Sequence, residues 1–139
     1  NTTAKEYFEK YIELFPNKRT TADLNLVLVK KKLGLFEDAL SDLNKLIDNI
    51  PNNEILYNNR GYMYNSRADL FMNLKRYDEA FVDVEKSLEV DPEYTTAIIT
   101  KGEIYYFQGD YGNACIFFKI ALSKRKKKEK LDKYMKNCK

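Results

Sequence analysis

Apolar residues recur every three or four positions along most of the chain, which is the spacing of one face of an α-helix. Three stripes of this kind begin at Ala39, Ala80 and Ala114, and a short segment typical of a turn precedes each of them. No stretch keeps the alternation of apolar and polar residues that a half-buried β-strand requires. The pattern therefore predicts an all-α fold of helices joined by short turns.

Landmark residues return along the chain at similar intervals. The three prolines are Pro16, Pro51 and Pro92, and the intervals between them are 35 and 41 residues. A set of alanines keeps step with them at Ala4, Ala39, Ala80 and Ala114. An aromatic residue precedes each of the last three alanines by three positions, at Phe36, Tyr77 and Tyr111. Intervals of this length are typical of helical repeats, which bury their apolar faces against one another.

These residues resemble the tetratricopeptide repeat, a helical hairpin of about 34 residues. In the last full repeat, the family's signature positions hold Ile98, Gly102, Tyr105, Gly109, Tyr111, Ala114, Phe118 and Ala121. The resemblance implies a right-handed α-solenoid of helix-turn-helix tetratricopeptide repeats. It also implies a noncatalytic module, or scaffold, that binds a peptide or helix of another protein in its concave groove.

The register of the repeats predicts one domain over residues 1–139. Its expected parts are the second helix of a leading half repeat at 4–19, repeats at 20–53, 54–94 and 95–128, and a basic capping helix at 129–139. The middle repeat has 41 residues, seven more than usual. Because seven residues are close to two helical turns, we expect its first helix to run from about Ile55 to Lys75. A loop insertion is the alternative.

Composition argues against an enzyme. The chain has no histidine, and histidine is the commonest general base and metal ligand. We therefore predict no catalytic residues, no metal site and no cofactor. The two cysteines are too few for a disulfide framework and are compatible with a reducing compartment. We expect Cys115 to be a buried core residue and Cys138 a residue of the cap. No apolar run is long enough to span a membrane, and a cytoplasmic location is weakly favoured.

The resemblance implies that the first helix of each repeat lines the binding groove. By register, the expected partner-binding residues are Leu24, Leu28, Asn58, Tyr62, Asn65, Thr96, Ile99, Glu103 and Tyr106. Family members that bind the acidic C-terminal tails of heat-shock chaperones use a clamp of lysines, asparagines and an arginine. The matching positions here hold Leu24, Leu28, Asn59, Thr96 and Thr100. Only Asn59 agrees, so we do not expect that clamp.

Charge leaves two alternatives open. Residues 119–139 carry a net charge of +8, whereas the rest of the chain carries −5. The basic C-terminal segment could bind nucleic acid or an anionic membrane. It lacks interleaved aromatic residues and any nucleic-acid module, so nucleic acid is disfavoured as a partner. Self-association into a homo-oligomer is the second alternative.

Overall fold

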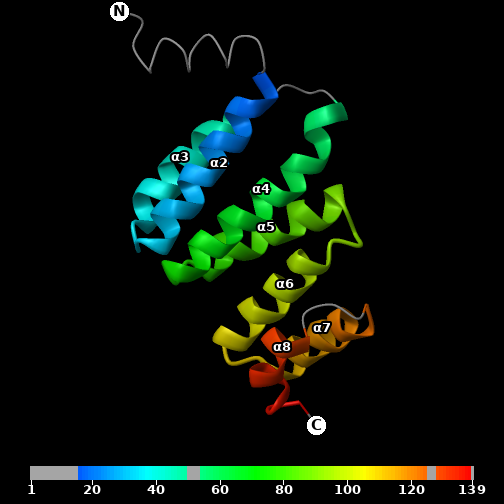
Figure 1. Ribbon diagram of the computed structural model, residues 1–139. Helices are drawn as coiled ribbons and strands as arrows, with labels where there is room; N and C mark the ends of the chain where they lie inside the picture. The colour runs from blue at the N-terminus through cyan, green and yellow to red at the C-terminus, as the bar shows by residue number, and fades with distance from the viewer. Residues whose placement is uncertain (1–15, 50–53, 125–127, 139) are drawn as a thin grey trace, which may run out of the picture. The chain divides into compact units, whose positions relative to one another are not determined.

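A computed structural model of the chain describes residues 16–49, 54–124 and 128–138 (Figure 1). Each element in these ranges is an α-helix, which confirms the all-α prediction for them: α2 (Pro16–Lys32), α3 (Phe36–Asp48), α4 (Glu54–Asn73), α5 (Tyr77–Val90), α6 (Thr95–Phe107), α7 (Tyr111–Ser123) and α8 (Lys128–Met135). By its backbone contacts the chain divides into two compact units, Asn1–Asn49 and Ile50–Lys139.

In the first unit, α2 and α3 form a helix pair joined by a short turn. The pair buries Val27 of α2 together with Ala39, Leu40 and Leu43 of α3. Two acids, Glu37 and Asp38, stand in the first turn of α3. Their charges stabilise the positive end of the helix dipole. The apolar stripe that starts at Ala39 in the sequence is therefore the buried face of α3.

The start of α2 corrects one predicted boundary. The sequence pattern places residues 16–19 at the end of a leading helix, whereas the structure places Pro16 at the beginning of α2. Proline is well tolerated there because the first residue of a helix needs no intrahelical hydrogen bond from its nitrogen. The rest of that predicted leading helix, residues 4–15, lies outside the described residues.

The turns after α2, α4 and α6 have the same backbone geometry. One residue in each has a positive φ angle: 76° at Gly34, 58° at Lys75 and 82° at Gly109. The residue that follows donates its N–H to a carbonyl five positions earlier, at distances of 2.8 to 2.9 Å. This Schellman arrangement closes the C-terminal end of a helix. The second turn departs from the others only in holding a lysine where its Cβ is sterically crowded.

Replacement of Lys75 by glycine is expected to raise the free energy of unfolding by about 0.5 to 1 kcal/mol. Glycine relieves the crowding at positive φ, and its greater freedom in the unfolded chain offsets part of that gain. The reverse change, Gly109→Lys, is the matched control and is expected to cost about 1 to 2 kcal/mol. Urea denaturation measures both, and a Lys75→Gly protein less stable than wild type would contradict the interpretation.

In the second unit, α4 pairs with α5, α6 pairs with α7, and α8 packs against α7 (Figure 1). Helix α4 is continuous over 20 residues from Glu54 to Asn73. The seven extra residues of the middle repeat are therefore helical, which excludes a loop insertion. They lengthen α4 beyond its partner α5, which has 14 residues.

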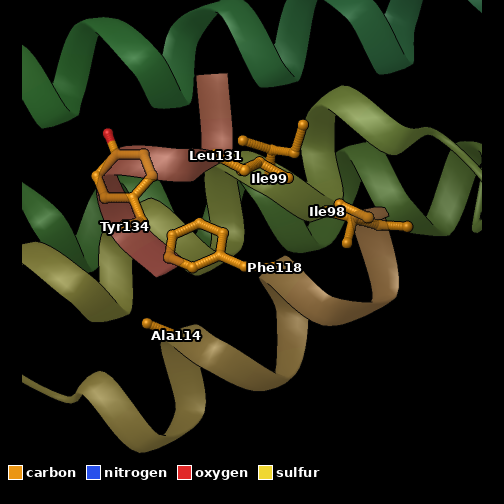
Figure 2. Packing of buried hydrophobic residues seen from close by; sticks show 7 residues of the cluster. Ile98, Ile99, Ala114, Phe118, Leu131 and Tyr134 are labelled. Carbon is orange, nitrogen blue, oxygen red and sulfur yellow. The ribbon is translucent and has the colours of Figure 1, made fainter. Parts of the chain in front are cut away.

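The buried core at the C-terminal end of this unit draws on three helices. Ile98 and Ile99 come from α6, Ala114, Phe118 and Ala121 from α7, and Leu131 and Tyr134 from α8. Figure 2 shows the rings of Phe118 and Tyr134 facing each other, with Leu131 beside Ile99. Helix α8 ends at Met135, earlier than the predicted range of 129–139, and a turn follows it.

Candidate functional site

Burial divides the predicted partner-binding residues into two groups. Asn65, Ile99 and Glu103 are buried, with exposed fractions of 6%, 0% and 9%. Five others are half-buried: Leu24, Leu28, Tyr62, Thr96 and Tyr106. Asn58 lies on α4, and its side chain is outside the described residues. Only the half-buried group offers side-chain surface to a partner.

Helix α8 accounts for much of the burial on α6. The ring of Tyr134 stacks on Phe118 at a centroid distance of 4.8 Å and an interplanar angle of 10°. The same ring meets Tyr106 at 4.8 Å and 65°. Leu131 is fully buried in the cluster that contains Ile99 (Figure 2). The chain's own C-terminal helix thus occupies the side of α6 on which Ile99 and Tyr106 were expected to meet a partner.

Polar contacts hold α8 in the same place. The hydroxyl of Tyr134 donates a hydrogen bond of 2.7 Å to one carboxylate oxygen of Glu103. The ammonium of Lys130 lies 3.6 Å from the other oxygen. The side-chain amide of Asn137 donates to the hydroxyl of Tyr106 at 3.0 Å. Glu103 is therefore an internal anchor for α8, which corrects its assignment as a partner-binding residue. The register of the repeats predicts which way the Glu103 side chain points, but it does not predict that α8 covers that side chain.

The buried hydroxyl of Tyr134 predicts a loss of stability at high pH. Burial, together with the hydrogen bond to Glu103 and its negative charge, raises the pKa of Tyr134 above its ordinary value of about 10. The unfolded chain therefore loses this proton before the folded chain does. We expect the free energy of unfolding to be unaffected by Tyr134 below about pH 10 and to fall as the pH rises above that value.

Urea denaturation at a series of alkaline pH values measures this loss. The Tyr134→Phe variant is the control, because it keeps the stacked ring and removes the titrating group. Its stability is expected to fall less steeply with pH. Some loss is expected to remain, since burial also raises the pKa of Tyr94. Equal slopes for the two proteins would contradict the assignment.

Two of the predicted residues meet at the start of α6. Tyr94 precedes this helix; burial raises the pKa of its hydroxyl, and Thr96 and Tyr62 of α4 are the neighbouring side chains that act on it next. All three side chains are half-buried. We call Tyr62, Tyr94 and Thr96 the tyrosine patch. It joins residues from successive first helices, and α8 supplies none of its members. Tyr94 was not among the predicted binding residues because it lies just outside the helix.

The two cysteines form a disulfide. Cys115 on α7 is bonded to Cys138 beyond α8, and their Cα atoms are 5.5 Å apart. The sequence pattern predicted a core residue and a cap residue without a bond between them. Their 23-residue separation gave no reason to pair them. The pairing depends on α8 folding back along α7, which the sequence pattern does not specify.

The described residues offer little for metal or membrane binding. Among residues 16–49, 54–124 and 128–138, no group of three or more acids or cysteines is placed to hold a metal ion. No helix in those ranges is both long enough and apolar enough to cross a membrane.

Two comparisons with known proteins identify the family. The tetratricopeptide repeat family model matches residues 56–94, which include all of α5 and most of α4. The fold also matches the second such domain of the human RPAP3 protein, solved in complex with the HSP70 peptide SGPTIEEVD. That match has a TM-score of 0.70 and 20% sequence identity, and covers 89% of this chain and 98% of the other. Residues 56–94 therefore carry a tetratricopeptide repeat, and the chain has the fold of a tetratricopeptide repeat domain.

The curated relatives that this chain matches are much longer. The Protein SGT1 homolog of Bos taurus is 32% identical over 76 residues, which are 55% of this chain and 20% of the relative. The Hsp70-Hsp90 organizing protein of Triticum aestivum is 27% identical over 90 residues, which are 65% of this chain and 14% of the relative. The chain thus spans a fifth or less of each relative.

Proposed function

We propose that the tyrosine patch on α4 and α6 binds an extended or helical segment of a partner protein, by contact and without catalysis. The observation that carries this proposal is the meeting of Tyr62 on α4 with Tyr94 and Thr96 at the start of α6, each with part of its side chain exposed. Tyrosine is favoured in binding surfaces because its ring gives apolar contact and its hydroxyl gives a hydrogen bond. That the RPAP3 domain binds a peptide supports a peptide segment as the general form of the ligand.

The ligand we propose is apolar or uncharged and polar, rather than an acidic tail. Four of the positions expected for a carboxylate clamp hold uncharged residues: Leu24, Leu28, Thr96 and Thr100. The Thr100 hydroxyl donates to the Thr96 carbonyl at 2.9 Å within α6 itself. A peptide carboxylate bound beside Thr96 and Thr100 would lose its hydrating water without gaining a positively charged hydrogen-bond donor. That exchange is unfavourable. We therefore expect the peptide SGPTIEEVD not to bind.

Replacement of Tyr62 by alanine is expected to weaken binding of a selected peptide at least about tenfold, the usual loss at an aromatic anchor. Peptides are first selected on the full chain from a phage-displayed library, and Kd is then measured by fluorescence anisotropy. Val82→Ala is the control, because Val82 is 54% exposed on α5, away from the patch. A folded Tyr62→Ala protein that binds as tightly as wild type would refute the proposal.

The basic C-terminal segment is better explained by contacts within the chain than by nucleic acid. Lys124 forms an ion pair with Glu93, and Lys130 forms one with Glu103. Both acids belong to the body of the second unit, whose charge is opposite to that of the segment. Self-association stays a prediction, and sedimentation velocity of the full chain tests it directly.

A further inference from the structure

The Cys115–Cys138 disulfide is placed where it controls the position of α8. It joins α7 to the residue three positions beyond the end of α8, and both cysteines are half-buried. A half-buried disulfide is within reach of a reductant in solution, unlike a cysteine sulfur deep in a core. The bond closes a loop that contains the whole of α8. Apart from the peptide backbone, no other covalent link joins α8 to the described residues of the unit.

Helix α8 has little capacity to stay in place by itself. It has eight residues, fewer than an isolated helix needs to be stable in water. Lys130 and Lys133 are three positions apart on it and repel each other, whereas Lys128 and Asp132, and Glu129 and Lys133, are four apart and attract. Its buried contacts are made by two side chains, Leu131 and Tyr134. The position of α8 therefore depends on these contacts together with the disulfide.

We propose that the Cys115–Cys138 disulfide is a redox-controlled clasp that keeps α8 over α6 and α7, and that its reduction uncovers a second partner-binding face. A dithiol reductant supplies two electrons and two protons. The S–S bond breaks, each cysteine sulfur becomes a thiol, and the reductant becomes a disulfide. The inference rests on the proposed function, because the uncovered face extends the binding surface along α6.

The contacts of α8 define the partner that this face fits. Ile99 and Phe118 form its apolar part, and both are buried when α8 is in place. Glu103 adds one carboxylate, which accepts from Tyr134 and pairs with Lys130. The face therefore fits an amphipathic helix that carries an aromatic residue and a lysine at the same spacing. The clasp is closed under oxidising conditions and open where dithiol reductants are abundant.

Hydrogen exchange of the 139-residue chain tests the clasp. Mass spectrometry follows the amides of residues 128–137 in the oxidised protein and after dithiothreitol treatment. We expect exchange there to rise roughly 100-fold on reduction, because a disulfide that closes a loop of this length restricts the released state by about that factor. Cys138→Ser is expected to exchange like the reduced protein without any reductant. Amides of α5 serve as the internal control.

Fluorescence of 8-anilinonaphthalene-1-sulfonate tests the uncovered face, since this dye becomes fluorescent on apolar surface. We expect its fluorescence to rise on reduction of wild type and to be high in Cys138→Ser throughout. Unchanged exchange in α8, or unchanged dye fluorescence, would overturn the proposal. Neither readout depends on the tyrosine patch. Failure of the clasp is therefore distinguishable from failure of the proposed function, which peptide affinity at Tyr62 reports.

Discussion

Replacement of Arg67 by methionine is expected to lower the free energy of unfolding by about 3 to 5 kcal/mol. Arg67 on α4 donates two hydrogen bonds to the carboxylate of Asp83 on α5, at 2.6 and 2.8 Å. The side chain of Asp83 is only 3% exposed. Removal of the guanidinium leaves a buried negative charge without its partner, and such a charge is far more costly to bury than a paired one.

The double variant Arg67→Met with Asp83→Leu is the matched control. It replaces the whole ion pair with apolar side chains, so no charge is left buried, and we expect it to recover most of the lost stability. Urea denaturation of the two single variants and the double variant gives the interaction energy of the pair. If the double variant loses as much stability as the two single variants together, the ion-pair explanation is contradicted. The result also shows whether the longer α4 depends on Arg67, which lies among its extra residues.

Replacement of Gly102 by alanine is expected to lower the free energy of unfolding by about 1 to 3 kcal/mol, although alanine favours helix over glycine. A Cβ atom at this position would lie 2.6 and 2.8 Å from two ring atoms of Phe118. That ring has no exposed surface and is stacked on Tyr134. It therefore cannot move away without disturbing the packing of α8. The close approach of α6 and α7 requires glycine here.

Gly61→Ala is the matched control, because Gly61 also lies within the first helix of a repeat. A Cβ atom there would lie 3.4 Å from a methyl group of Val90, which is ordinary contact. We expect this variant to be as stable as wild type or more stable by up to about 1 kcal/mol, the helix preference of alanine over glycine. Thermal unfolding followed by circular dichroism measures both proteins. Equal effects at the two glycines would refute the packing argument.

Much of the fold follows from local pattern. The apolar stripes that begin at Ala39, Ala80 and Ala114 become the buried faces of α3, α5 and α7. Helical periodicity also predicts that the extra residues of the middle repeat lengthen α4. These features are predictable because each depends on residues close together in the sequence, where side-chain spacing and turn geometry decide the structure.

The parts that sequence did not predict all depend on contacts between distant residues. Arg67 and Asp83 are 16 positions apart, and Tyr134 and Glu103 are 31 positions apart. Register placed Glu103 and Ile99 on a binding surface, but the fold-back of α8 buries both. The same fold-back brings Cys138 to Cys115. Tyr62 and Thr96 keep exposed surface because α8 lies against the other end of α6.

Nuclear magnetic resonance mapping of a bound peptide tests the central claim most directly. A peptide selected from the library is added to the oxidised, isotope-labelled full chain, and backbone amide shifts are followed during the titration. We expect the largest changes at Tyr62, Tyr94 and Thr96, with little change on the outer face of α7 around Ile116. Changes confined to α7, or to the basic segment after Ser123, would contradict a binding surface on the first helices.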